Sequence, residues 1–308
     1  MFLKKSNKLI LFIACLVTSV LQMNAQQDPQ YTMYMFNTMS VNAAYAGTND
    51  YSLITALHRS QWVGLDGAPS TQTIAYDTPI NDRVGLGFSV VNDEIGPSNE
   101  LFLDGNFSYK IPVTAKAKLS FGIKAGARLL NVDFTKGSTA SSLDAAFENN
   151  IDNQLLPTIG VGALLYTNKS YLGLSIPNFI ETEYYDADTG LIAEERFHLF
   201  FIGGYVFDLK KNIKFKPAFL TKLVDGAPLS VDLSGSLYFN DLVHAGLSYR
   251  WDDSVSAIVG VNITKKLMVA YAYDLTTTDL GNYNSGSHEI TLQYRFIKNS
   301  VLRSPRYF

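Results

Sequence analysis

The sequence predicts an all-β fold, a transmembrane outer-membrane β-barrel of about 14 antiparallel strands. Segments of about ten residues, in which apolar and polar residues alternate, follow one another from residue 51 onward. Long and short connections alternate between these segments, as they do in bacterial barrels. Hydrophobic residues make up 47% of the chain and charged residues only 17%. Beyond the first residues, however, no stretch approaches the roughly 20 apolar residues of a spanning helix. A lipid-embedded chain without such helices must form a closed sheet, because lipid offers its backbone no hydrogen bonds.

The final segment, 288–296, shows the alternation most clearly, with one apolar face and one polar face. Ile290, Leu292, Tyr294 and Phe296 form the apolar face, and Glu289, Thr291, Gln293 and Arg295 form the polar face. This period of two indicates a strand whose two faces meet different solvents. The predicted strands are 51–59, 70–77, 83–90, 101–110, 119–129, 156–166, 171–176, 197–207, 213–223, 230–239, 243–249, 255–261, 266–274 and 288–296.

The connections favour a barrel over a soluble β-sandwich, which would also show alternation. The short turns are 79–82, 167–169, 208–212, 240–241 and 264–265, and the long connections are 60–69, 131–155, 177–196 and 275–287. Short turns are periplasmic and long loops external in bacterial barrels, so both ends of the barrel are expected in the periplasm.

Charged residues on the polar faces are expected to line the lumen, where they can pair or meet water, because a dry sandwich core would make them costly. The residues expected to face the lumen are Arg83, Asp104, Lys124, Arg128, Asp232, Arg250, Glu289 and Arg295. Recurrent strand glycines, among them Gly85, Gly87, Gly122 and Gly162, indicate closed curvature or close packing, because glycine weakens an isolated strand.

Residues 1–25 have the pattern of a secretory signal: early lysines, an apolar run over 9–21 and a small residue at Ala25. Lipidation at Cys15 is the alternative, but the apolar run continues beyond that residue. Removal of the signal also removes the only cysteine, which leaves no disulfide and no thiolate metal site. We predict no cofactor and no metal site. The net charge of −3 argues against a nucleic-acid partner.

Three further parts follow the signal. The segment 26–50 carries large apolar groups, including Tyr31, Tyr34, Phe36 and Tyr45, which a disordered tail would lack. It is expected to plug the barrel mouth or to dock on a periplasmic partner, and an irregular cap over barrel side chains is equally compatible with it. The barrel occupies 51–296. A basic tail, 297–308, ends in Tyr307 and Phe308 and either contacts periplasmic partners or is a frayed terminus.

Two loops carry candidate binding features. Trp62 lies in a loop rich in turn-forming glycines, so it either anchors a partner or belongs to the interfacial aromatic girdle. The carboxylates of the connection 177–196 either bind calcium or form a solvated loop, and irregular spacing favours the loop.

His58 and Ser60 have the spacing of a histidine and a serine on one strand face of an outer-membrane phospholipase, but no third group of a triad is evident. The remaining histidines stand singly on different strands, without metal-ligand spacing. The simpler interpretation places His58 and Arg59 at a strand end on the membrane rim. We therefore predict that the protein is not an enzyme.

Several motifs together resemble the PorP/SprF family of Bacteroidetes outer-membrane proteins associated with type IX secretion. The motifs lie at 27–37, 41–47, 58–69, 85–87, 92–97 and 304–308, and so span nearly the whole mature chain. Ala43 departs from the pattern, which is expected to have proline there. The resemblance implies a barrel that works with the secretion machinery to export, hold or display a large surface adhesin, including gliding adhesins in some relatives.

The implied partners are outer-membrane lipid, the secreted adhesin or its C-terminal secretion signal, and secretion or motor components. The alternative function is a porin-like or hydrophobic-ligand channel, which would need an open lumen.

Overall fold

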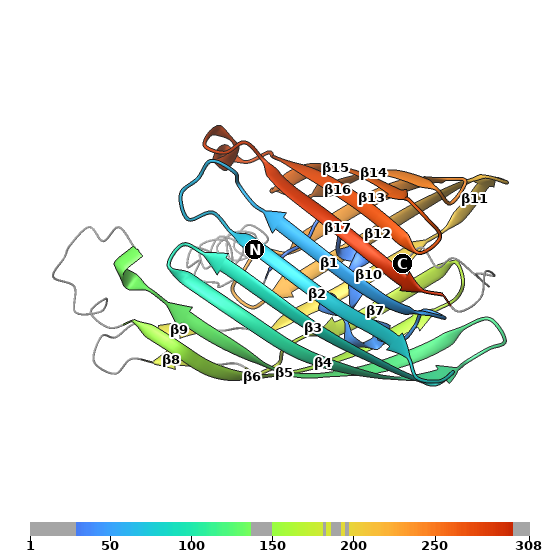
Figure 1. The fold of residues 1–308 in the computed structure, drawn as a ribbon, viewed down its shortest axis with the longest axis horizontal. Helices are drawn as coiled ribbons and strands as arrows, with labels where there is room; N and C mark the ends of the chain where they lie inside the picture. Colours follow the sequence, from blue (N-terminus) through green and yellow to red (C-terminus); the bar gives the residue numbers. More distant parts are fainter. Residues whose placement is uncertain (1–28, 137–149, 181–182, 186–191, 195–196, 298–308) are drawn as a thin grey trace, which may run out of the picture.

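A ring of antiparallel strands encloses residues 29–49 in the computed structural model (Figure 1). The structure describes residues 29–136, 150–180, 183–185, 192–194 and 197–297. The predicted signal at 1–25 and the tail beyond 297 lie outside the described residues. Among the described residues, no helix is long and apolar enough to cross a membrane.

Fourteen strands form the ring. They are β1 (Ser52–Ser60), β2 (Ser70–Pro79), β3 (Val84–Ile95), β4 (Ser98–Pro112), β5 (Lys118–Val132), β6 (Ile151–Tyr166), β7 (Ser170–Ile176), β10 (His198–Tyr205), β12 (Ile213–Val224), β13 (Ser230–Phe239), β14 (Val243–Arg250), β15 (Ser254–Asn262), β16 (Leu267–Thr276) and β17 (Ser287–Phe296). Consecutive strands pair antiparallel, and β1 pairs with β17. The pairing of β10 with β12 completes the closed barrel that the alternation predicted.

Three further short strands are present among the described residues. The strand β11 (Phe207–Lys210) follows β10 and pairs with the beginning of β12. The strands β8 (Glu183–Tyr185) and β9 (Ile192–Glu194) pair with each other within the connection predicted at 177–196. The side chains of this connection's carboxylates lie outside the described residues. The end of the barrel with long connections is called the external end below, and the end with short turns the periplasmic end.

Every predicted strand overlaps an observed one, but several strands are longer than predicted, most of all at the external ends of β3 to β6. The strands β4, β5 and β6 have 15, 15 and 16 residues, and their external ends extend into parts predicted as connections. Beyond the lipid both faces of a strand meet water, so the ladder continues there without an alternating sequence. The alternation therefore located the membrane-spanning part of each strand and underestimated its external part.

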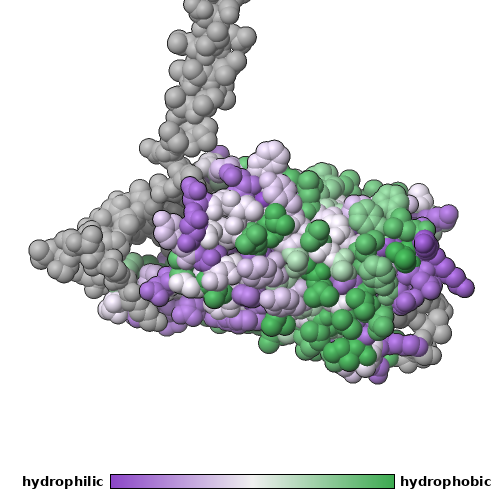
Figure 2. Space-filling model, turned by 90° about the horizontal axis from the view of Figure 1, so that it is seen from above, coloured by the Kyte–Doolittle hydropathy of each residue, from purple (hydrophilic) through white to green (hydrophobic). Residues whose placement is uncertain are grey.

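The two faces of the strands have opposite environments. On β17, Ile290 and Leu292 are 50% and 43% exposed, whereas Glu289 and Thr291 are fully buried at 0%. Figure 2 shows that the apolar side chains form a band over the part of the barrel away from the long connections, with hydrophilic side chains at both ends. This distribution is that of a barrel with a lipid-facing belt and a polar interior.

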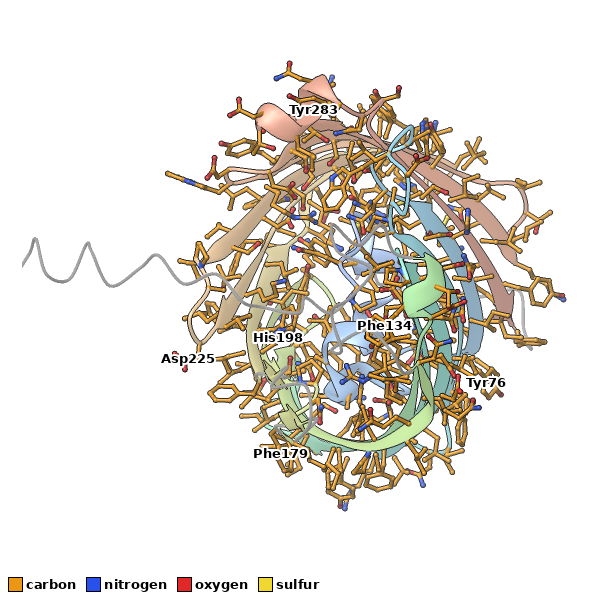
Figure 3. The ribbon with its side chains drawn as sticks, turned by 90° about the vertical axis from the view of Figure 1, so that its left-hand side faces the viewer. Tyr76, Phe134, Phe179, His198, Asp225 and Tyr283 are labelled. Atoms are coloured by element: carbon orange, nitrogen blue, oxygen red, sulfur yellow. The ribbon has the colours of Figure 1, made fainter. Side chains whose placement is uncertain are left out.

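Residues 29–49, called the plug below, lie inside the barrel. They form three short helices, η1 (Tyr34–Phe36), α2 (Thr38–Val41) and η2 (Ala43–Tyr45). Figure 3, viewed along the barrel from the external end, shows these helices within the ring and Tyr76 on its outside. Of the three alternatives for the N-terminal segment, the structure therefore agrees with a plug inside the barrel. Two further short helices, η3 (Phe134–Lys136) and η5 (Asp279–Asn282), lie at external connections.

Candidate functional site: the plugged lumen

A buried ionic network holds the beginning of the plug. The Arg59 guanidinium lies 2.7 Å from the Asp274 carboxylate and 2.9 Å from that of Glu289, and all three side chains are almost fully buried. Glu289 also accepts hydrogen bonds from the backbone N–H groups of Thr32, at 2.9 Å, and Met33, at 2.8 Å. These N–H groups would otherwise be buried without a partner, so the network fixes the plug as well as itself.

A second buried pair contacts the same part of the plug. Nε of Arg250 donates to Asp232 at 2.7 Å, and its Nη2 donates to the carbonyl oxygen of Tyr31 at 3.3 Å. The Tyr31 hydroxyl lies 2.8 Å from Oγ1 of Thr73 on β2. The first residues of the plug are thus bonded to β2 on one side of the β1–β17 pair and to β14 on the other.

Small residues cover the opposite wall, where five neighbouring strands each contribute one to a continuous stripe. In cross-strand register from β3 to β7, this small-residue stripe is Gly85, Ser108, Gly122, Gly162 and Ser175. A Cβ atom at Gly122 would overlap the backbone of Ala43 and Ala44, and one at Gly85 would overlap that of Ala46. The absence of side chains therefore lets the backbone of the plug lie directly on the sheet.

The serines of the stripe bond to the backbone that lies on it. Oγ of Ser108 donates to the carbonyl oxygen of Ala46 at 2.6 Å, and Oγ of Ser175 donates to that of Val41 at 2.8 Å. Asn42 caps η2 by accepting from Ala44 N, and its amide donates to the carbonyl oxygen of Ala163 on β6 at 3.1 Å. The two serine bonds satisfy carbonyl groups that the short helices of the plug leave without partners.

The plug leaves the lumen at the periplasmic end. Gly47 has a φ of +60°, a conformation that favours glycine, and its N–H donates to the Asp77 carboxylate. Nζ of Lys110 donates to the Gly47 carbonyl oxygen at 2.5 Å, and the Asn49 amide reaches Asp77 at 3.3 Å. The plug therefore runs from the external half of the lumen to the periplasmic rim before it enters β1.

Most of the charges expected in the lumen are buried there in ion pairs. Lys124 lies 3.1 Å from Asp104, and Arg128 lies 3.2 Å from Glu100. Asp232, Arg250 and Glu289 belong to the contacts above, and Arg295 is half-buried and bonds to Asn262 at 3.0 Å. Arg83 differs, because it is exposed in the turn before β3. Its position in the alternation is that of an inward residue, but the turn carries it beyond the sheet.

The residues expected to contact partners lie in three places. Tyr31, Tyr34 and Tyr45 are buried within their own barrel, which corrects the expectation of an accessible partner surface for these rings. Burial raises the pKa of the Tyr45 phenol well above its usual range, so it stays neutral. Phe36 is half-buried beside a cavity. Tyr307 and Phe308 lie outside the described residues.

The Trp62 loop has a fixed shape at the external end. Trp62 is half-buried, and its N–H donates to Oγ of Ser287 at 3.1 Å. Val63 exchanges two backbone hydrogen bonds with residues 285–286, and the N–H of Gly96 donates to the carbonyl oxygen of Gly67 at 2.9 Å. The loop is thus tied to both neighbouring connections, and Val63, at 38% exposure, presents an apolar side chain to solvent.

The His58 and Ser60 side chains do meet, at 3.1 Å between Nε2 and Oγ, on the outer face of β1. No third side chain is bonded to the His58 ring among the described residues. Arg59, expected beside them at the rim, instead points inward because alternate residues of a strand face opposite sides. Within the described part of the chain, no group of three histidine, cysteine or acidic residues is placed to hold a metal ion.

A cavity of about 570 Å³ lies at the periplasmic end, between the plug and the inner faces of β13 to β17, β1 and β2. On one side of the cavity the rings of Phe36 and His244 pack together, with their centroids 5.1 Å apart. The side-chain amide of Gln293 donates to the Phe36 carbonyl oxygen at 2.9 Å. No sequence pattern predicted this cavity. Its lining residues come from distant segments, and only the alternation on β17 could have marked Gln293 as inward.

Comparison with known proteins gives solved barrels of similar fold. The CymD monoaromatic hydrocarbon channel is 12% identical, with 89% of this chain and 95% of that chain covered and a TM-score of 0.47. For the Ralstonia pickettii toluene transporter TbuX the identity is 12%, the coverage 86% and 93%, and the TM-score 0.46. A Pseudomonas aeruginosa FadL homologue is 12% identical, with 89% of this chain and 96% of that chain covered and a TM-score of 0.47. At these identities the likeness concerns the fold alone.

No curated protein matches the sequence. The pattern of the type IX secretion system membrane protein PorP/SprF family, in contrast, matches residues 23–294. This range includes the plug and nearly all of the barrel. The chain therefore belongs to the PorP/SprF family of type IX secretion system membrane proteins and is located in the outer membrane.

Proposed function

We propose that this protein is a plugged, non-catalytic barrel that assists type IX secretion by anchoring or displaying a large cell-surface adhesin. The family supports an association with secretion components and with the membrane. The plug is the observation that carries the proposal. Its hydrogen bonds to β1, β2, β4, β6, β7, β14 and β17 span the lumen, which favours a binding role over an open conduit.

The Trp62 loop is the proposed contact surface for the adhesin or its C-terminal secretion signal. Its ties to Ser287 and Gly96 order the loop before binding, so little conformational entropy is lost when a partner docks. A tryptophan in such a loop is a frequent energetic centre of an interface. Motor components and gliding adhesins are further proposed partners, which the family alone suggests.

The test is surface retention of the adhesin in cells that express either Trp62→Ala or Trp251→Ala. Trp251 is 67% exposed in the external turn between β14 and β15, away from the Trp62 loop, and serves as the matched control. We expect Trp62→Ala to release the adhesin, while Trp251→Ala retains it and both barrels keep their gel mobility without heating. Retention by both variants would contradict the anchor.

A second measurement separates this function from a channel. Purified protein in a planar bilayer is expected to show no stable large conductance, and deletion of residues 26–48 is expected to create one. Stable large conductance of the intact protein would favour the porin-like or hydrophobic-ligand channel.

A further inference from the structure

The periplasmic cavity contains an unusual set of polar groups. Four of its lining residues carry a buried side-chain atom that has no hydrogen-bond partner among the described residues: Nδ2 of Asn37, the hydroxyl of Tyr45, Nε2 of His244 and Nε of Arg295. The Asn37, Tyr45 and His244 side chains are more than nine-tenths buried. A buried polar group without a partner is costly, so four such groups around one cavity indicate that something bonds to them.

The unpartnered groups are mainly donors. An amide nitrogen and a guanidinium nitrogen can only donate, and a hydroxyl and an imidazole nitrogen can do so. Together they favour an acceptor-rich, negatively charged group such as a carboxylate.

The charges around the cavity agree with that preference. Arg295 and Lys265 contribute positive charge. The two lining carboxylates already have partners, because Asp77 bonds to Gly47 and Asn49, and Asp241 pairs with Lys214 at 3.0 Å. Arg295 and Lys265 therefore attract a ligand anion, whereas both lining carboxylates are already engaged within the protein.

Part of the remaining lining is apolar and adaptable. Phe36 and Met268 face the cavity together with the methionines of the plug, Met35 and Met39. Thioether side chains fit varied apolar shapes, and a volume of about 570 Å³ is in the usual range for a small organic ligand. The short turns 240–242 and 263–265 line its mouth, so a ligand enters from the periplasmic end.

We propose that this cavity binds a carboxylate carried on an aliphatic or aromatic body and presented from the periplasm. The carboxylate bonds to Arg295, Asn37 and Tyr45, and the apolar body lies against Phe36 and Met268. A free carboxylic acid and the C-terminal residue of a polypeptide have this chemistry in common. The site does not depend on the adhesin-binding role proposed above.

The experiment is calorimetric titration of the full protein in detergent, with a micelle-only blank. Decanoate represents a free acid, N-acetylphenylalanine a polypeptide C-terminus, and N-acetylphenylalanine amide the same body without the charge. We expect at least one carboxylate to bind with a dissociation constant below about 1 mM, and the amide to bind at least about tenfold more weakly. Binding of decanoate alone identifies a free acid, and binding of N-acetylphenylalanine alone identifies a polypeptide end.

Three variants test the assigned contacts. Arg295→Met should weaken binding at least about tenfold, because it removes a charged donor. Tyr45→Phe should weaken it severalfold without loss of stability, because the hydroxyl has no partner among the described residues. Lys116→Met, in the exposed turn between β4 and β5 and outside the cavity lining, is the matched control and should have little effect.

Equal binding of acid and amide, absence of carboxylate binding, or unchanged affinity in both Tyr45→Phe and Arg295→Met would overturn the proposal. If Arg295→Met does not fold, as judged by its gel mobility without heating, Tyr45→Phe alone decides.

Discussion

The two walls of the lumen hold the plug in different ways. On the stripe wall, β3 to β7, glycines remove the side chains and the backbone of the plug lies on the sheet. On the charged wall, β13 to β17 with β1, long side chains reach inward, and the plug is bonded to Arg59, Glu289, Arg250 and Gln293. Side-chain size thus decides how near the plug comes to each wall. The cavity lies between the plug and the charged wall, where the two are farther apart.

The two walls also stabilise the plug by different kinds of interaction. Contact with the stripe is close packing, in which any added atom causes overlap. Contact with the charged wall consists of buried charges, which are expensive when one partner is removed. A substitution on each wall should therefore fail for a different physical reason.

The largest effect is expected on the charged wall, for Arg59→Met. It leaves the Asp274 and Glu289 carboxylates buried without their cation, which should lower stability by about 3 to 5 kcal/mol. Denaturant unfolding of the barrel in detergent measures this. Lys169→Met is the control, because Lys169 pairs with Asp208 at 2.5 Å in exposed positions and should change little. Equal losses in both variants would contradict the network's role.

The next effect is expected on the stripe, for Gly122→Val. The new side chain overlaps the backbone of Ala43 and Ala44 and should displace the plug, at a cost of about 1 to 3 kcal/mol. Planar-bilayer recording should then show conductance that the native protein is expected to lack. Gly105→Val is the matched control, because a Cβ there meets only ordinary contacts, at 3.5 Å or more. Conductance in the Gly105 variant as well would mean that strand disruption, and not plug contact, opens the lumen.

The strands could be predicted from the sequence, but the two walls that hold the plug could not. Alternation is local to each strand, so residues such as Ile290 and Glu289 could be assigned to opposite faces without a structure. The glycines signalled close packing, yet the stripe depends on cross-strand register, which sets Ser108 and Ser175 in line with them. The aromatic composition of the plug is compatible with a lumen, a cap or a partner surface. Only the bonds from Arg59 and Glu289 distinguish these places.

A smaller effect is expected from Ser108→Ala. The variant removes the hydroxyl that donates to the Ala46 carbonyl oxygen at 2.6 Å, which should cost about 1 kcal/mol. Ser120 on β5 is equally buried, but its hydroxyl has no hydrogen-bond partner among the described residues, so Ser120→Ala should cost nothing. Denaturant midpoints of the two variants compare them directly. If both variants lose the same stability, the bond from the stripe to the plug contributes nothing.

The smallest effect, and the only stabilising one, is expected from Ala43→Pro. Ala43 is the first residue of η2, where proline needs no N–H partner, and Asn42 before it is already extended, with φ of −147° and ψ of 113°. Proline restricts the unfolded chain, so stability should rise by about 0.5 to 1 kcal/mol. The denaturant midpoint measures this gain. A loss of stability would show that the proline ring does not fit against the stripe beside Gly122. Close packing on this wall would then outweigh the preference for proline at the first position of η2.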